Sequence, residues 1–436
     1  YKKDPLAADV GFLRAENLFF LGRLDEAGTA YADYVKAQKP AHPQYAAATF
    51  RRAQVHHRSG RWAEALKLAA PLVADLPKDP VFEELRFLVG EAHFRLEQWD
   101  KASASLSAYL QGRPEQAAHT DTAVVELGVA QVRAGDTKAA TAQFERFVQR
   151  FLKSPHRPLA LSELGRLRYE AGDLQGARAA LQEFVKSHAT APQRAKVEYT
   201  LGCVALDEKN EDAAEKHFGE VVRSFAKDPL APEAALQLGL LQVNRKKFAE
   251  AKKTLALFLK QHPKHAEADA ATFSLGVAHA RAEEWRPAAG YFQKVVTAFP
   301  ESTFGERALY EWAWCEKGQQ RNTEAAQRYE QLLAKYPTGT LAAKVRTELA
   351  ELTFDAKAYD KVIAQLQDTL AQLTDKTVKG QTLYRLGTAY FNKGDFEKSA
   401  ATFEQFIKEY PGIDLQASAR FQAGESRLKL KETVAA

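Results

Sequence analysis

The residues best suited to hold a metal ion are histidines in the first quarter of the chain. His56 and His57 are adjacent, and His93 follows His56 by 37 residues. Imidazole nitrogens bind Zn²⁺, but protein zinc sites commonly add cysteine or carboxylate ligands at short spacing, and none stands at such a spacing here. His56 and His93 also share a repeating position with His279, which favours a packing role. We expect no metal, with a His56–His57–His93 site as the weaker alternative.

Sequence motifs for catalysis and cofactor binding are missing. The chain has no P-loop, GxGxxG, HExxH, EF-hand loop, CxxC or GxSxG motif. Its many carboxylates do not form a recognisable acid–base pair. The sequence therefore predicts a protein that is not an enzyme and that needs no cofactor.

Three arginines recur at a regular interval and could bind anions. Arg58, Arg95 and Arg133 are separated by 37 and 38 residues. A guanidinium group pairs well with a carboxylate, so a row of arginines would attract an acidic partner. An arginine near the carboxyl end of a helix also stabilises the helix dipole, and this simpler role is the alternative.

The regular spacing of these residues reflects a repeat that covers almost the whole chain. A glycine or alanine returns at intervals of 37 or 38 residues. A fixed period of this length is typical of solenoids, in which each supersecondary unit packs on its neighbours. The repeat outweighs the roughly two to four domains that the length alone suggests. The repeated small residues are Ala15, Ala53, Gly90, Gly128, Gly165, Gly202, Gly239, Gly276, Ala313, Ala350, Gly387 and Gly424.

Other positions keep the same phase and describe a helical hairpin. A second small residue follows the first by twelve positions, as in Ala177, and a bulky residue follows by sixteen, as in Leu181. Small residues at the crossing let two helices approach to about 8–10 Å. A turn residue seven or eight positions after the first small residue, such as Gly172 or Asn210, separates the two helices. Proline ends many of the second helices.

The order Leu-Gly, alanine, aromatic, proline resembles the tetratricopeptide repeat. Leu275-Gly276 is followed in this order by Ala288, Phe292 and Pro300. The resemblance covers nearly the whole chain and implies stacked helical hairpins. Two features depart from the family pattern: the period is longer than the usual 34 residues, and an aromatic residue three places before the small residue replaces the early tryptophan.

The longer repeat is similar to that of bacterial envelope proteins. Its linker, seen in Phe299-Pro300-Glu301-Ser302, resembles those of the outer-membrane assembly lipoproteins and the Tol–Pal coordinator. The resemblance therefore implies an envelope protein of the tetratricopeptide class.

The repeat predicts an all-α, right-handed superhelical solenoid of about eleven helix-turn-helix repeats, followed by a capping helix. We expect residues 1–436 to form a single tetratricopeptide solenoid, because each repeat packs on the next in one continuous core. The predicted repeats span about residues 8–45, 46–82, 83–120, 121–157, 158–194, 195–231, 232–268, 269–305, 306–342, 343–379 and 380–416, and the capping helix spans 417–436.

The family resemblance also implies where a partner binds. First helices line the concave face in this family, so residues one, four and five places after the small residue should face a groove. The three arginines would form one sector of it, and an apolar sector would take the anchor residues of a peptide. The apolar stretch could instead be covered by superhelical curvature or a neighbouring turn. Besides the arginines, the predicted groove residues are Cys203, Leu206, Leu240, Val243, Val277, Trp314, Phe354 and Phe391.

The composition limits the partners. A formal net charge of +5 from 61 Lys and Arg against 56 Asp and Glu describes a mixed surface, which argues against nucleic acid as a partner. No run of 18 apolar residues occurs, so no transmembrane segment is expected. Cys203 and Cys315 are three repeats apart, on the order of 25–30 Å, which is too far for a disulfide.

These observations predict a non-catalytic scaffold or adaptor that binds protein or peptide segments. The envelope-type repeat implies a role in bacterial envelope assembly or secretion, in the periplasm and near a membrane-associated complex, with the cytoplasm as the alternative. Two other functions stay open: the substrate-recruiting arm of a larger enzyme, and a structural spacer. Because the chain begins with Tyr1, we expect a trimmed or processed product rather than a complete translated reading frame.

Overall fold

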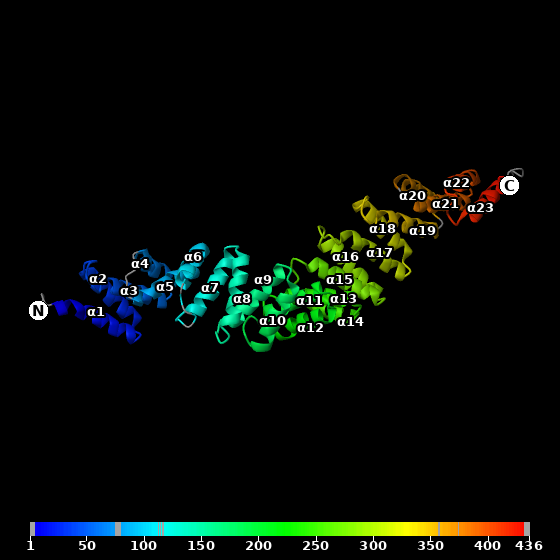
Figure 1. Ribbon diagram of the computed structural model, residues 1–436. Coiled ribbons are helices and arrows are strands. Elements are labelled where there is room, and N and C mark those ends of the chain that lie inside the picture. Colours follow the sequence, from blue (N-terminus) through cyan, green and yellow to red (C-terminus); the bar gives the residue numbers. More distant parts are fainter. Residues whose placement is uncertain are drawn as a thin grey trace. The chain divides into compact units, whose positions relative to one another are not determined.

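The computed structural model describes residues 5–74, 80–111, 113, 115, 117–355, 358–373 and 375–430. Throughout these residues the regular elements are helices, as the sequence predicts, and no strand occurs among them (Figure 1). The contacts of the backbone divide the chain into two compact units: unit 1, residues 1–217, and unit 2, residues 218–436.

Unit 1 is built from consecutive pairs of helices. A short 3₁₀ helix, Pro80–Glu83, precedes the third pair. The helices are α1 (Pro5–Phe20), α2 (Leu24–Ala37), α3 (Tyr45–Arg58), α4 (Trp62–Ala74), α5 (Glu84–Arg95), α6 (Trp99–Leu110), α7 (Thr120–Arg133), α8 (Thr137–Arg150), α9 (Arg157–Glu170), α10 (Leu174–Ser187) and α11 (Arg194–Asp207). The boundary between the units falls within α12 (Glu211–Ser224).

Unit 2 continues the alternation of helices of similar length. Its helices after α12 are α13 (Ala231–Asn244), α14 (Phe248–Gln261), α15 (Ala268–Arg281), α16 (Trp285–Ala298), α17 (Gly305–Gly318), α18 (Asn322–Lys335), α19 (Ala342–Asp355), α20 (Tyr359–Gln372), α21 (Lys376–Lys393), α22 (Phe396–Glu409) and α23 (Gln416–Lys429). We call the odd-numbered helices A helices and the even-numbered ones B helices.

The helices pack in the order of the sequence, which confirms the predicted helix-turn-helix repeats. From α1 to α11, and again from α13 to α23, consecutive helices contact each other, and some A helices also contact the next A helix, as α5 contacts α7 and α13 contacts α15. The predicted final helix is present as α23, and residues 431–436 of the predicted cap lie outside the described residues. The right-handed twist and the single continuous solenoid stay predictions.

The repeated small residue marks the point where each A helix meets its own B helix. A Cβ built on Gly165 of α9 would lie 2.3 Å from Leu181 Cδ2 on α10. On Gly128 of α7 it would lie 2.8 Å from the ring of Phe144 on α8. Leu181 and Phe144 are both buried. The bulky residue sixteen places later therefore packs directly over the small residue of the same hairpin, which explains their common phase.

The turn between A and B helices places one residue in the left-handed backbone region. This residue lies seven positions after the repeated small residue. It is glycine in some turns, such as Gly172 with φ 80°, but a side chain occupies it in others, such as Lys246 with φ 59°. Asn210 lies between α11 and α12, as predicted for a residue that separates the two helices, but it is not the residue with positive φ. Lys209 has the positive φ of 60°, and Asn210 Oδ1 caps α12 by accepting a 3.1 Å hydrogen bond from Ala213 N.

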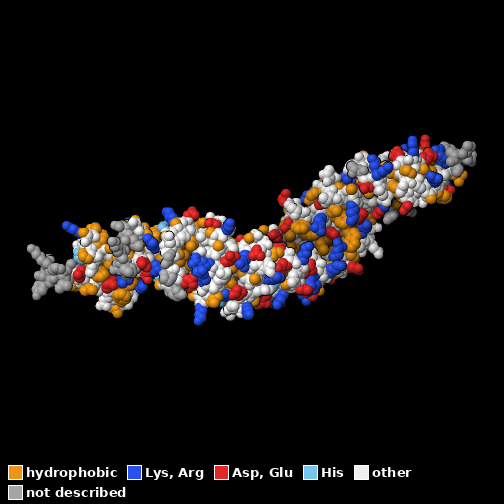
Figure 2. All heavy atoms as spheres, in the orientation of Figure 1, with side chains coloured by type: hydrophobic (Ala, Val, Ile, Leu, Met, Phe, Trp, Pro, Cys, Tyr) orange, Lys and Arg blue, Asp and Glu red, His pale blue; other side chains and the backbone are white. Residues whose placement is uncertain are grey.

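The surface agrees with the small net charge. Figure 2 shows Lys and Arg side chains interspersed with Asp and Glu on the visible face of both units. Among the residues that the structure describes, no helix is both long enough and apolar enough to cross a membrane.

Candidate partner-binding face of the A helices

The three arginines predicted to form a row differ in their surroundings. Arg58, Arg95 and Arg133 are the last residues of α3, α5 and α7, so each lies where a cation stabilises the helix dipole. The guanidinium of Arg58 lies 4.5 Å from the ring centroid of Phe19, at cation–π distance. The contacts of each arginine therefore decide which of them can bind a partner.

Arg95 is engaged by carboxylates of its own chain. Its Nη2 donates to Glu91 Oε1 at 3.0 Å and to Glu126 Oε1 at 3.2 Å. Glu91 also pairs with His57, whose Nε2 lies 3.0 Å from Glu91 Oε2. The guanidinium of Arg95 is thus held by partners within its own chain, and the repeat pattern does not predict this pairing.

Glu126 is an unusual member of this cluster. Its residue is only 5 % exposed, and its Oε2 has no hydrogen-bond partner in the described part of the chain. Burial first, and then the charge of Glu91, raise the pKa of Glu126 to about 8, although Arg95 opposes the shift. The carboxyl of Glu126 therefore stays largely protonated at neutral pH.

Arg133 is exposed and lies at a pocket of unit 1. No ion pair or hydrogen bond joins its side chain to any residue within the described ranges. The pocket has a volume of about 430 Å³. Phe94, Val129, Val132 and Leu159 give it an apolar floor, and Arg133, Glu163, Arg166 and Lys196 give it a charged rim. All of these residues come from four A helices: α5, α7, α9 and α11.

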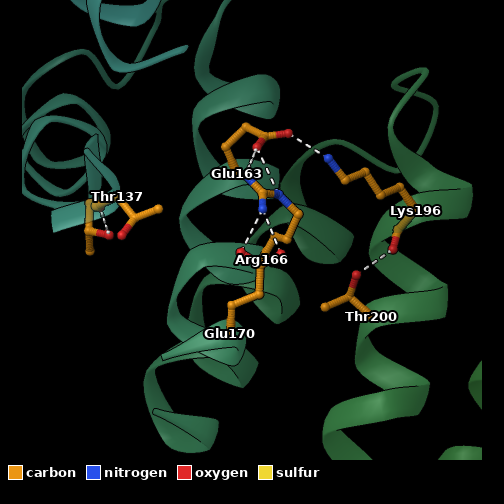
Figure 3. A network of polar contacts seen from close by, with 7 residues as sticks. Thr137, Glu163, Arg166, Glu170, Lys196 and Thr200 are labelled. Atoms are coloured by element: carbon orange, nitrogen blue, oxygen red, sulfur yellow. Dashed lines mark hydrogen bonds and ion pairs between the residues drawn. The ribbon is translucent and has the colours of Figure 1, made fainter. Parts of the chain in front are cut away.

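A network of ion pairs fixes the rim of this unit 1 pocket (Figure 3). Glu163 accepts hydrogen bonds from Arg166 Nη2 at 2.8 Å and from Lys196 Nζ at 2.6 Å. Arg166 Nη1 donates to Glu170 Oε1 at 2.6 Å. Burial opposes the ionisation of Glu163, but Lys196 and Arg166 outweigh it and lower the pKa of Glu163. Four long side chains are thereby held in fixed positions before any partner arrives.

The sequence interpretation missed most of this rim. Arg166 follows Gly165 directly, so it occupies a predicted groove position that was not singled out. Glu163 and Lys196 lie two and six places before a repeated glycine, outside the three positions assigned to the groove. Because the first helix turn of α11 lies beside the middle of α9, a wider set of positions reaches the same face.

The predicted apolar sector is divided between the two units. In unit 1, Cys203 and Leu206 are half-buried on α11. In unit 2, Leu240 and Val243 pack against the cluster that contains Leu255, and Val277 packs against another that contains Phe292. These side chains contribute to the core of their hairpins while part of their surface stays accessible.

The predicted aromatic groove residues are half-buried and pack against other aromatic rings. Phe354 and Phe391 each meet, edge to face, the first residue of the next helix: Tyr359 at 5.6 Å and Phe396 at 5.4 Å. Trp314 on α17 meets Trp285, the first residue of α16 in the preceding hairpin, edge to face at 5.1 Å. Trp62 and Trp99 cover His57 and Phe94 in the same way. The tryptophans that begin α4, α6 and α16 therefore pack against aromatic rings at the hairpin tips.

A second pocket lies in unit 2 around Phe354. Its volume is about 260 Å³, and it is mostly apolar. Glu351 and Arg385, at its edge, form an ion pair of 2.6 Å. The pocket is lined by Ala350, Glu351, Phe354, Val362, Leu366, Tyr384, Arg385 and Thr388.

The histidines considered for metal binding have other contacts. His57 pairs with Glu91, and His93 Nδ1 lies 2.7 Å from Gln98 Oε1. Burial first, and then Arg61 and Arg52, lower the pKa of His56. The described residues contain no group of three or more histidine, cysteine or acidic side chains that could hold a metal ion.

Family models match four segments of the chain. A model of outer membrane lipoproteins matches residues 194–353. A tetratricopeptide-repeat model matches residues 12–80 and 125–193, and another matches residues 381–412. The helical hairpins, with their small-residue crossings and their A-helix face, define the chain as a repeat protein of the α-solenoid class. Within that class, it is a tetratricopeptide-repeat protein.

Several solved structures of tetratricopeptide-repeat proteins are similar to this chain. The C-terminal part of a repeat protein from Cytophaga hutchinsonii is 17% identical, with 68% of this chain and 98% of that chain covered and a TM-score of 0.39. A repeat protein from Parabacteroides merdae is 13% identical, with 62% and 99% covered and a TM-score of 0.39. YrrB, described as having an unusual peptide-binding site, is 18% identical, with 48% and 98% covered and a TM-score of 0.40. No curated protein matches the chain.

Proposed function

We propose that this protein is a non-catalytic scaffold whose A-helix face binds extended or helical segments of partner proteins. The observation that carries the proposal is the unit 1 pocket, because four successive A helices build it and no B helix contributes to its lining. An apolar floor beside fixed charges suits a peptide, since apolar anchors supply affinity and polar contacts supply register. The unit 2 pocket around Phe354 would add a second anchor site.

We further propose that the scaffold acts in bacterial envelope assembly or secretion, in the periplasm. The match of residues 194–353 to outer membrane lipoproteins supports this setting. The longer repeat, with its Phe-Pro-x-Ser linker, points the same way. A cytoplasmic scaffold is the alternative, and fractionation of the native host would separate the two locations.

Site-specific photo-cross-linking in the native host tests the binding face. Probes would replace Val132, at the unit 1 pocket, and Val243, on α13 of unit 2. Matched control probes would replace Gln182 on α10 and Lys294 on α16, which are exposed on B helices. We expect the A-helix probes to capture one partner through a defined peptide, mapped by mass spectrometry, and the control probes not to capture it. Equal capture from both faces, or no capture at Val132 and Val243, would contradict the proposal.

A further inference from the structure

We propose that the unit 1 pocket binds an acidic segment of a partner protein, with one carboxylate of that segment at Arg133 and a neighbouring apolar side chain on the pocket floor. This inference rests on the proposed scaffold function and adds the chemistry of the partner.

Arg133 is the cation of this face that is ready to bind a carboxylate. Arg95 already pairs with Glu91 and Glu126, and the guanidinium of Arg58 lies over Phe19. Arg133 is exposed and has no such partner in the ranges that the structure describes. A partner that binds here does not have to break an existing ion pair, and it gains a charge-assisted hydrogen bond.

The charge balance of the rim selects a single carboxylate. Three cations, Arg133, Arg166 and Lys196, and one carboxylate, Glu163, line the rim. Glu170 lies outside the lining but pairs with Arg166, so the rim with its ion-pair partner is left with one positive charge. One Asp or Glu of a partner would neutralise this charge. A phosphorylated residue, which carries close to two negative charges, would leave an excess of negative charge.

The floor of the pocket specifies the neighbour of that acidic residue. Phe94, Val129, Val132 and Leu159 offer an apolar surface next to the charged rim. Val129, Val132 and Leu159 pack from their other side against the core that contains Phe144 and Leu161, so the floor is rigid. An acidic residue beside Leu, Ile, Val or Phe matches both features, whereas an acidic run without an apolar residue leaves the floor exposed to water.

The position of Arg133 at the end of α7 accounts for a cation by itself, because the helix dipole favours one there. The dipole does not account for an apolar floor beside it or for a rim held by ion pairs. A purely structural arginine would affect stability but not the choice of peptide. The experiment therefore determines which peptide sequences the protein selects, as well as how tightly it binds them.

The experiment is selection from a random peptide library displayed on phage, with the full chain immobilised. Wild type is compared with R133E, with the milder R133Q, and with K138E, which makes the same charge change at an exposed residue of α8. Circular dichroism checks that each variant is folded. The affinity of the best wild-type peptide is then measured by fluorescence anisotropy, alongside the same peptide with its acidic residues replaced by Asn or Gln.

We expect wild type and K138E to enrich peptides with Asp or Glu beside an apolar residue. R133E should weaken the best peptide by about tenfold or more, the size of one lost charged contact, and the amide peptide should bind wild type as weakly. Enriched peptides without an acidic excess, or equal affinity of R133E, overturn this inference but leave the scaffold function standing. A wild-type chain that enriches no peptide counts against both.

Discussion

A single hydrogen bond of 3.2 Å joins Arg95 Nη2 to Glu126 Oε1 and leaves the other oxygen of Glu126 buried without a partner in the described residues. This contact ties the end of α5 to the middle of α7, across two hairpins. It also removes Arg95 from the set of cations that can bind a ligand. The Glu126 carboxyl, with its raised pKa, makes the stability of this junction depend on pH.

We expect the E126Q variant to be more stable than wild type at high pH and similar to it at low pH. Burial and the charge of Glu91 raise the pKa of Glu126 from 4.5 to about 8, so the folded state holds the proton more tightly than the unfolded state. The stabilisation that comes from this tighter proton binding is fully present below about pH 4.5 and is lost as the pH rises through about 8. Glutamine keeps the neutral form at every pH.

Thermal unfolding followed by circular dichroism at pH 5 and pH 9 measures this effect. The gain for E126Q at pH 9 should be on the order of a few kcal/mol, since each unit of pKa shift corresponds to about 1.4 kcal/mol. The Tm values of wild type and E126Q would then converge on acidification. If the Tm difference between wild type and E126Q were the same at pH 5 and pH 9, Glu126 would be ionised in the folded protein.

The close approach of Gly165 and Leu181 predicts that G165A destabilises unit 1. An added Cβ would lie 2.3 Å from Leu181 Cδ2, and Leu181 is buried with little room to move. Overpacking of this kind costs about 1–3 kcal/mol, which exceeds the gain of up to about 1 kcal/mol from replacing a helical glycine. Chemical denaturation would show a lower midpoint.

Gly290 on α16 provides the matched control for this substitution. It is exposed and helical, and a Cβ added there would meet nothing within 4 Å. G290A should therefore stabilise the protein by about 0.5–1 kcal/mol through helix propensity alone. If both alanine variants changed stability in the same direction, the crossing contact at Gly165 would not be the cause.

At turn positions where a residue with a side chain adopts positive φ, substitution by glycine should stabilise the protein. Lys246 has φ 59° in the turn between α13 and α14, a region that costs a non-glycine residue about 1–2 kcal/mol. K246G should raise the Tm, by less than that cost because glycine also adds freedom to the unfolded chain. G172A, at the same turn position of another hairpin with φ 80°, should lower it. If K246G had a lower Tm than G172A, the cost of positive φ could not explain the result.

The two thiols should react slowly in the folded protein. Both cysteines are free, and burial raises the pKa of Cys203 to about 11 and that of Cys315 to about 12. Because the thiolate is the reactive form, a disulfide reagent at pH 8 should modify the native protein at least about tenfold more slowly than the chain in guanidinium chloride. In a C203S variant only Cys315 can react, so the variant shows which thiol accounts for any residual reaction. A rapid native reaction would place a thiolate at one of these positions.

The repeat period made the fold predictable from the sequence. Gly165 and Leu181 keep their spacing because they touch, and the turn residue keeps its spacing because only one place between the helices has positive φ. Such constraints act within one hairpin and recur in each copy. The sequence predicted Asn210 between the helices but not its capping role, because capping residues and turn residues are neighbours with similar preferences.

The candidate binding face was predictable only in part. The repeat placed Arg58, Arg95 and Arg133 at equivalent positions, but it did not show that Glu126, on another hairpin, engages Arg95. Contacts between hairpins depend on residues that are not repeated and on the rotamers of long side chains. Periodicity therefore predicts which positions face outward, while the structure is needed to tell which of them is still able to bind.

Inside each unit the hairpins pack on one another through the same kinds of contact, and this has an evolutionary consequence. Gain or loss of one 37-residue segment inside a unit would join surfaces that already fit each other. The length of such a protein can thus change by duplication or deletion of whole hairpins, while residues such as Arg133 diverge separately in each copy. New specificities could arise in this way without disturbing the architecture.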